Sequence, residues 1–204
     1  MIGNYERDVG FVMGELNRRI VTDGQVFPGD VLKVDSFLNH QIDPEIMHEI
    51  TGKWLEYFKD REITKILTVE ASGIAPAIIV ASTLGVPMLF AKKATPSTLT
   101  NRDLYTAPVH SYTKNVTNEI LVSKKYLSPD DKVLIVDDFL ANGEAALGLA
   151  DLVEQSGAEV VGIGICIEKS YQPGRRKLDD AGYDVYSISR IQSLANGKVE
   201  FLSE

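Results

Sequence analysis

Short apolar runs alternate with segments of helical periodicity along most of the chain. The runs rich in β-branched residues, typical of buried parallel strands, are residues 63–69, 86–91, 133–136, 160–167 and 183–189. The segments with apolar positions at helical spacing are residues 44–58, 77–84 and 144–155. This alternation predicts an α/β fold with a mainly parallel twisted sheet flanked by helices.

Local signals predict several element boundaries. Asp43 is a good N-cap, and Pro44 follows it at the first helical position. Gly157 stands at the expected C-cap of the third helix. Gly162 and Gly164 interrupt an expected interior strand, which indicates that a covering element packs closely on it.

The segment 94–126 is different in kind, because it is rich in Thr, Ser and Asn and has no helical period. Residues 107–113 and 119–125 alternate well enough to predict an antiparallel pair. The long polar loop before them, 95–106, is typical of a mobile lid. A second hairpin is expected near the C-terminus, turned by Asn196 and Gly197.

Length and composition indicate one globular domain. The chain has 204 residues, of which 44% are hydrophobic and 25% charged, the balance of a soluble globular protein. Residues 1–12 show no clear period, so we expect a disordered extension there and a single domain over 13–204. Met13 is a candidate for the natural start of that domain.

Charge and cysteine content exclude several classes of partner. A net charge of −8 argues against nucleic acid, whose binding needs a basic face. The single cysteine, Cys166, lies in an apolar run and reads as buried and without a disulfide partner, as in a reducing cytoplasm. No apolar run approaches the roughly 18 residues of a membrane span, so we expect no membrane partner and a cytoplasmic location.

The central candidate site is the run 133–145, in which an apolar strand leads into Asp137 and Asp138, a turn and a helix. Ligands of open α/β sheets bind at the carboxyl ends of strands. The turn and the helix N-terminus can direct N–H groups at an anion, while the two carboxylates can accept hydrogen bonds from vicinal hydroxyls. Both features fit a ribose phosphate. In the alternative interpretation, one carboxylate caps the helix and the other is solvated.

Other polar groups also follow expected strands. Ala71, Ser72 and Gly73 form a small-residue turn that would let backbone approach a ligand closely. Lys92 and Lys93 follow the next expected strand directly. For each of these segments an ordinary turn or a solvated charge pair is the alternative.

The run 133–145 resembles the signature of the type I phosphoribosyltransferases, which use phosphoribosyl pyrophosphate (PRPP). The resemblance implies that Asp137 and Asp138 are the catalytic acids that hold the ribose hydroxyls. The loop that it implies for the 5′-phosphate comprises Ala141, Asn142, Gly143, Glu144 and Ala145. Ser or Thr is common in the family at three of these positions, so backbone amides must do more of the binding here. The groups that it implies for the pyrophosphate are Ala71, Ser72, Gly73, Lys92 and Lys93.

Three segments, 31–41, 137–143 and 168–175, are similar to the bacterial subgroup of this family that acts on xanthine. The resemblance implies a base site with Lys169 at the 6-oxo group, Tyr171 stacking on the ring, and contacts from Leu32 and Asn39. The implied reaction is transfer of the phosphoribosyl group from PRPP to N9 of xanthine, which gives XMP and pyrophosphate in purine salvage.

The resemblance also implies that Mg²⁺ is carried by PRPP and not held by the protein alone, that the protein is a homodimer, and that a lid hairpin covers the site. A small hood subdomain is expected from about 25–41 and 169–204. Glu70 would repel a pyrophosphate unless a metal ion lay between them, so its role is left open.

Two alternatives remain at this point. The first is an enzyme for hypoxanthine or guanine. The second is a non-catalytic PRPP-sensing regulator, which needs a DNA-binding segment or a basic face. Twelve extra N-terminal residues cannot supply the former, and a net charge of −8 argues against the latter.

Overall fold

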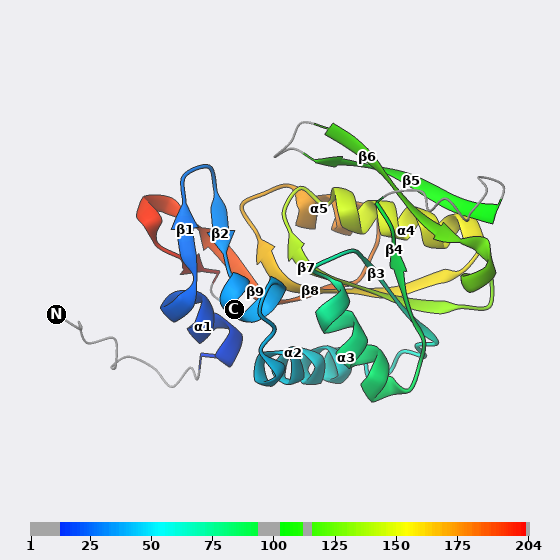
Figure 1. Cartoon of the computed structure of the whole chain (residues 1–204), viewed down its shortest axis with the longest axis horizontal. Helices are drawn as coiled ribbons and strands as arrows, with labels where there is room; N and C mark the ends of the chain where they lie inside the picture. Colours follow the sequence, from blue (N-terminus) through cyan, green and yellow to red (C-terminus); the bar gives the residue numbers. More distant parts are fainter. Residues whose placement is uncertain (1–12, 94–102, 112–115, 203–204) are drawn as a thin grey trace.

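The computed structural model describes residues 13–93, 103–111 and 116–202 and has an α/β architecture (Figure 1). Its main sheet has six strands in the order β10-β9-β8-β7-β3-β4. The parallel strands are β3 (Lys65–Val69), β4 (Met88–Ala91), β7 (Lys132–Leu140), β8 (Glu159–Lys169) and β9 (Val185–Ser193). The short β10 (Glu200–Phe201) pairs antiparallel with β9. The predicted mainly parallel sheet is therefore confirmed.

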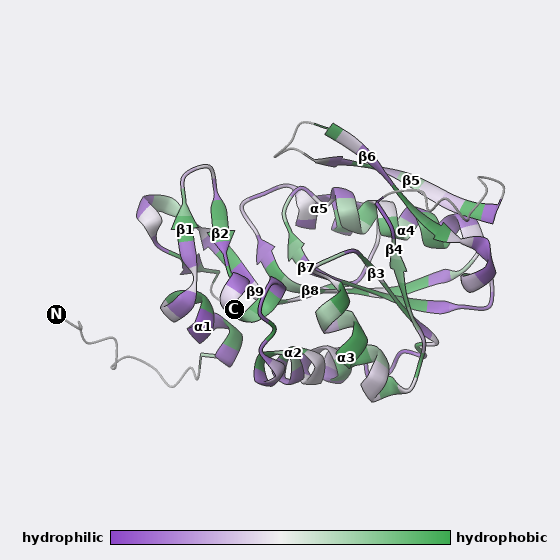
Figure 2. Ribbon diagram, in the orientation of Figure 1, coloured by the Kyte–Doolittle hydropathy of each residue, from purple (hydrophilic) through white to green (hydrophobic). Residues whose placement is uncertain are grey.

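Helices cover both faces of this sheet (Figure 1). The helices α1 (Glu15–Asp23), α2 (Pro44–Tyr57) and α3 (Ile74–Leu84) pack in one apolar cluster, and α4 (Glu144–Ser156) and α5 (Gly174–Asp180) pack in the other. Along β7, Leu134 faces the first cluster and Val133 the second. Burial on both sides explains the continuous apolar run of this strand, which is mostly hydrophobic in Figure 2.

Two hairpins flank the sheet. The strands β1 (Gln25–Phe27) and β2 (Val31–Lys33) pair antiparallel and lead into a π-helical turn, Asp35–Asn39. The strands β5 (Leu104–Ser111) and β6 (Val116–Ser123) pair antiparallel and lie over α4 (Figure 1). No helix of the described residues is long and apolar enough to cross a membrane.

The pairing of β5 with β6 confirms the predicted hairpin, but the prediction that the polar loop continues to residue 106 is wrong. The strand β5 already begins at Leu104, which is buried, and Lys92 forms an isolated bridge with Leu121 that ties the hairpin to the end of β4. The rest of that loop, residues 95–102, and the expected extension 1–12 lie outside the described residues.

Several boundaries differ from the predicted ones. The helix α3 begins at Ile74, directly after the turn, because Pro76 is tolerated in a first helical turn. The sequence did not predict α5, whose buried residues are only Gly174 and Leu178, too few to produce a helical pattern. The predicted caps are confirmed: Asp43 accepts a hydrogen bond from the Glu45 N–H at 3.0 Å, and Gly157 is left-handed with φ of 79°.

The two glycines of β8 allow α2 to pack closely on the sheet, as predicted. A Cβ atom on Gly162 would lie 2.3 Å from Cε1 of Phe58, and one on Gly164 would lie 2.9 Å from Cε2 of Trp54. The Trp54 indole donates a hydrogen bond to the Tyr186 carbonyl at 3.3 Å, which fixes α2 against β9. The volume that the glycines leave free is thus filled by aromatic rings.

We expect Gly162→Ala to lower the free energy of unfolding by about 1–3 kcal/mol, because the added methyl group displaces the buried Phe58 ring. Gly52→Ala is the matched control: Gly52 lies in α2 with nothing within 4 Å of an added Cβ. That variant should gain roughly 0.5–1 kcal/mol from the lower backbone entropy of the unfolded chain. Urea denaturation measures both, and equal stabilities of the two variants would contradict the packing argument.

Candidate active site

Two adjacent carboxylates lie near the end of β7. Asp137 and Asp138 are only 5% and 9% exposed. The predicted strand ended before them, but β7 continues to Leu140, because its pairing with β8 extends to Glu168. The Asp138 N–H donates a hydrogen bond to Oδ1 of Asp137 at 3.0 Å. The acids are therefore held by strand backbone and not by a loop.

Burial dominates the electrostatics of this pair. Removal from water, and next the charge of Asp138, raise the pKa of Asp137 well above its ordinary value, while Lys93 acts weakly in the opposite direction. Burial likewise raises the pKa of the Cys166 thiol, with a smaller contribution from the same two carboxylates. Burial and the neighbouring acid therefore disfavour the ionised form of Asp137, and a bound cation or a set of hydroxyl donors would offset that cost.

The π-helical turn brings a predicted base-site residue to the acids. Nδ2 of Asn39 donates a hydrogen bond to Oδ2 of Asp138 at 3.3 Å, although 99 positions separate the two residues. Leu32, on β2, is 7% exposed and belongs to the apolar cluster of α1, α2 and α3. The Asn39 amide thus reaches the acid pair. Leu32, by contrast, packs the β1–β2 hairpin against the apolar cluster.

The loop after β7 is held against the first residue of α5. Gly143 is left-handed, with φ of 85°, and immediately precedes α4. The Gly174 N–H donates a hydrogen bond to the Ala141 carbonyl at 2.9 Å, and a Cβ on Gly143 would lie 3.0 Å from the Gly174 Cα. Glu144 is directed toward α5, where its Oε1 accepts from Lys177 Nζ at 2.7 Å. The N–H groups that begin α4 are thereby fixed as a potential anion site.

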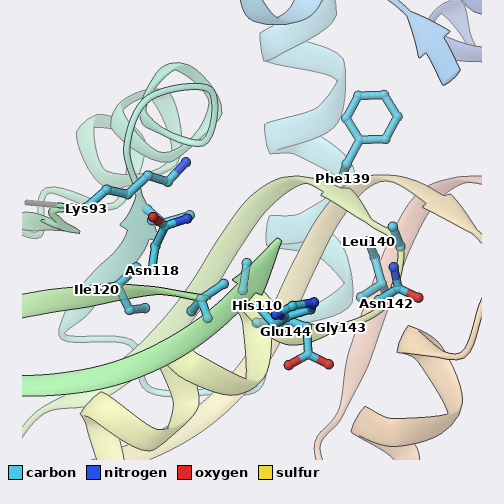
Figure 3. A pocket seen from close by; sticks show the side chains of 14 residues that line it. Lys93, His110, Asn118, Ile120, Phe139, Leu140, Asn142, Gly143 and Glu144 are labelled. Carbon is cyan, nitrogen blue, oxygen red and sulfur yellow. The ribbon is translucent and has the colours of Figure 1, made fainter. Parts of the chain in front are cut away.

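A pocket of about 390 Å³ opens between this loop and the β5–β6 hairpin (Figure 3). One part of its wall consists of the loop and the start of α4. These supply the predicted phosphate residues Ala141, Asn142, Gly143, Glu144 and Ala145, and also Ala146. The residues that line it from other elements include Val69, Lys93, Val109, His110, Asn118, Ile120 and Phe139. Lys93, from the end of β4, and His110 and Asn118, from the hairpin, therefore add polar groups to the pocket wall.

The predicted pyrophosphate turn packs directly on Asp137. A Cβ on Gly73 would lie 2.0 Å from Thr68 Oγ1 and 3.1 Å from Asp137 Oδ1, so only glycine fits there. Ala71 and Ser72 precede it, and the Glu70–Ala71 peptide is cis. Glu70, whose role the sequence left open, accepts a hydrogen bond from the Lys93 N–H at 2.7 Å and so ties this turn to the end of β4.

The two predicted lysines separate. Lys93 lines the pocket, whereas Lys92 exchanges backbone hydrogen bonds with Leu121 and places its Nζ 5.9 Å from the Phe90 ring centroid. Among the described residues, no group of three His, Cys, Asp or Glu side chains has the arrangement of a metal site.

Lys169 ends β8 on the other side of the acids. Its Nζ donates a hydrogen bond to the Asp30 carbonyl at 2.5 Å and lies 5.9 Å from the Phe139 ring centroid. Burial lowers the pKa of this ammonium, with Asp30 opposing the shift. Tyr171 is 39% exposed, so its predicted stacking role stays a prediction.

Sequence reasoning missed Phe139, His110 and Asn118. Phe139 directly follows the acid pair, so its position in the motif could have marked it as a site residue. His110 and Asn118 lie on the hairpin, and only its placement over α4 brings them to the pocket.

The chain is similar to known proteins in both sequence and structure. The phosphoribosyl transferase domain family matches residues 34–199. The chain is 57% identical to xanthine phosphoribosyltransferase of Macrococcus caseolyticus, over 94% of this chain and 98% of that protein. It is 54% identical to the protein of the same name from Clostridium acetobutylicum, over 93% and 100% of the two chains.

Solved structures of adenine phosphoribosyltransferases have a similar fold. The enzyme of Rhodothermus marinus superposes with a TM-score of 0.66 at 28% identity, over 80% of this chain and 90% of that chain. The enzyme of Giardia lamblia, complexed with 9-deazaadenine, also gives 0.66, at 26% identity and the same coverage.

We expect Asp137→Asn to raise the melting temperature at pH 7 by about 2–4 °C, equivalent to about 1 kcal/mol. Because the pKa of Asp137 is raised on folding, its contribution to stability is present below the unfolded pKa and is lost as the pH rises through the folded pKa. Asn retains the Oδ1 acceptor without the charge, so the gain should shrink as the pH is lowered. Thermal denaturation at several pH values measures it.

Asp131→Asn is the matched control for this substitution. Burial alone would raise the pKa of Asp131, but hydrogen bonds from Lys65 and Ser128 outweigh it and lower that pKa. This control should therefore lose stability at pH 7. A loss of stability in both variants would contradict the electrostatic account of Asp137.

Proposed function

The chain belongs to the phosphoribosyl transferase family, and on that basis we propose that it transfers the phosphoribosyl group of PRPP to N9 of xanthine, giving XMP and pyrophosphate. The observation that carries the reaction class is the buried acid pair of β7, which a short loop connects to the N-terminus of α4. The choice of xanthine is supported by relatives that are 53–57% identical over nearly the whole chain.

We infer that the ribose and its 5′-phosphate occupy the pocket beside β7. Asp137 and Asp138 would accept hydrogen bonds from the 2′- and 3′-hydroxyls, which can donate to carboxylates as water does. The N–H groups of residues 141–145 would bind the 5′-phosphate, because the helix N-terminus favours an anion. Residues 141–145 have no hydroxyl side chains, so the phosphate would be bound by backbone N–H groups. The left-handed Gly143 would let the loop direct these groups at the phosphate.

The pyrophosphate would leave toward the turn of Ala71, Ser72 and Gly73, with Lys92 and Lys93 beyond it. The site fits Mg²⁺ arriving with PRPP, because Asp137 and Asp138 are adjacent carboxylates and carboxylate oxygens suit that ion. When bound, Mg²⁺ supplies positive charge to the leaving pyrophosphate oxygens. Glu70 holds the Lys93 backbone, so the turn and the lysine are oriented as one unit.

The chemistry follows from charge. As the C1′–O bond breaks, its electron pair leaves with the pyrophosphate and positive charge develops on the sugar. The two carboxylates would lie beside the ribose and stabilise that charge. The lone pair of N9 forms the new bond to C1′ from the opposite face, and the imidazole ring of the base releases its N–H proton to water. Positioning and electrostatic stabilisation supply the rate, and the reaction requires no nucleophilic side chain.

We infer that the base binds between Phe139 and the hood. One of the three Lys169 N–H donors contacts Asp30, so others can reach a 6-oxo group, whereas the 6-amino group of adenine offers no acceptor there. Phe139 would offer a ring face to the purine, and the Asn39 amide a donor to the 2-oxo group of xanthine. An unpaired buried donor costs about 1–3 kcal/mol, so guanine and hypoxanthine should be discriminated roughly ten- to a hundredfold.

We also infer a single domain over 13–204 with a hood formed by about 25–41 and 169–204. This is supported by the contact of β1 with the turn at Ala195–Gly197 and by the bond from Lys169 to Asp30. In Figure 1 the β1–β2 hairpin lies beside the C-terminal segment, drawn in red. A homodimer and a cytoplasmic location stay predictions.

The proposed activity is tested by incubating the protein with PRPP, Mg²⁺ and one of four purines, and following pyrophosphate release. We expect turnover to be fastest with xanthine, slower with guanine and hypoxanthine, and at background level with adenine. Faster turnover with guanine or hypoxanthine would contradict the base preference. Absence of turnover with every base, with PRPP binding retained, would instead favour the PRPP-sensing regulator.

We expect Gly143→Val to weaken PRPP binding by at least about tenfold. The new side chain is strained at a φ of 85°, and its Cβ would lie 3.0 Å from the Gly174 Cα. Ala141→Ser and Ala145→Ser are the controls, and their affinities should stay within about twofold because backbone carries the contact. Titration calorimetry measures all three, with circular dichroism to verify folding. Equal affinities would contradict this picture.

A further inference from the structure

A fully buried carboxylate lies beside the proposed base site without belonging to it. Glu168 precedes Lys169 at the end of β8, and its side chain is 0% exposed. A carboxylate removed from water is stable only when hydrogen bonds and opposite charges surround it. Its partners therefore reveal which parts of the molecule it joins.

Glu168 is bound by four side chains from three segments. The Ser170 hydroxyl, on the turn after β8, and the Ser187 hydroxyl, on β9, donate to its two oxygens at 2.6 Å each. The guanidinium groups of Arg175, on α5, and Arg190, on β9, approach at 3.3 and 3.4 Å. Burial alone would raise the pKa of Glu168, but these hydrogen bonds and charges outweigh it and lower that pKa, so the group is ionised at neutral pH.

The partners of Glu168 lie next to two separate substrate contacts. On one side, Ser170 follows Lys169 and its N–H donates to the Ile191 carbonyl at 2.8 Å, which fixes the strand end that carries the lysine. On the other side, Arg175 follows Gly174, whose N–H is bonded to Ala141 in the proposed phosphate loop. One carboxylate thus ties down both ends of the segment 169–175.

We propose that Glu168 is a positioning residue that holds Lys169 and the N-terminus of α5 together, so that the base site and the phosphate loop keep a fixed separation. This rests on the proposed function, because it assigns substrate groups to Lys169 and to residues 141–145. Glu168 touches neither substrate. Its effect on both arises because each of the two contacts is anchored through the same segment.

A purely structural role makes a different prediction, and Asp131 provides the comparison. Asp131 is also a buried carboxylate, 9% exposed, which accepts from Lys65 at 2.6 Å and from the Ser128 N–H at 2.8 Å. It immediately precedes β7, at the opposite edge of the sheet from Asp137 and Asp138. Loss of either charge should lower stability, but only Glu168 should affect the substrates.

The test compares Glu168→Gln with Asp131→Asn in steady-state kinetics and in calorimetric titration of PRPP and of XMP. We expect Glu168→Gln to raise the KM for xanthine and for PRPP together by about tenfold or more, and to weaken XMP binding to match, because small displacements of positioned groups are costly. The change in kcat should be smaller. Asp131→Asn should leave both KM values within about twofold while lowering the melting temperature.

A second variant covers the case in which Glu168→Gln does not fold. Ser187→Ala removes one partner of Glu168 from β9 without changing its charge, and should raise both KM values in the same direction by a smaller factor. Unchanged KM values in both variants, or a rise for one substrate alone, would overturn the proposal. Absence of turnover by the unaltered protein would overturn the proposed function and this inference with it, so the two failures are distinguishable.

Discussion

The requirement to keep two adjacent carboxylates out of water, at the edge of a sheet that is itself buried, governs the design of this molecule. Asp137 and Asp138 are part of a strand covered by helices on both faces, so neither can turn away to solvent. Their surroundings are correspondingly close: a glycine turn packs on one acid and an asparagine amide bonds to the other. Burying this pair lowers the stability of the fold, and it places two acidic groups where we propose that the sugar cation forms.

The other segments of the site are held in place around the acid pair by contacts of their own. The turn at residues 71–73 is locked by its contact with β7 and by Glu70, and the loop at residues 141–143 is locked by α5. Lys169 is held by the hood on one side and lies next to the buried Glu168 on the other. Each group that we propose to contact a substrate is thus backbone or a side chain with a second anchor, which would limit the reorganisation needed at the moment of reaction.

Much of the fold could be predicted because its signals are local. The strand and helix alternation, the cap at Asp43 and the glycines of β8 each act through neighbours in sequence or through the shape of one element. The contacts that complete the site are not local. The bond from Asn39 to Asp138 spans 99 positions, and the hairpin reaches the pocket only because Gly148 lets it settle on α4. The helix α5 could not be predicted, because it contacts the loop at residues 141–143 mainly through backbone. It therefore buries too few apolar side chains to show a helical pattern.

The mutual contact of Gly143 and Gly174 has a consequence for how such a chain can change over time. Each glycine occupies the space that a β-carbon on the other would need, and Gly174 also lies against the Ala141 carbonyl. A larger residue at either position would therefore clash with the other. No second substitution could compensate, because the other position already holds glycine, the smallest residue. Substitution at either position therefore requires the backbone of the loop or of α5 to move, whereas the proposed backbone contact at residues 141 and 145 would place no such constraint on their side chains.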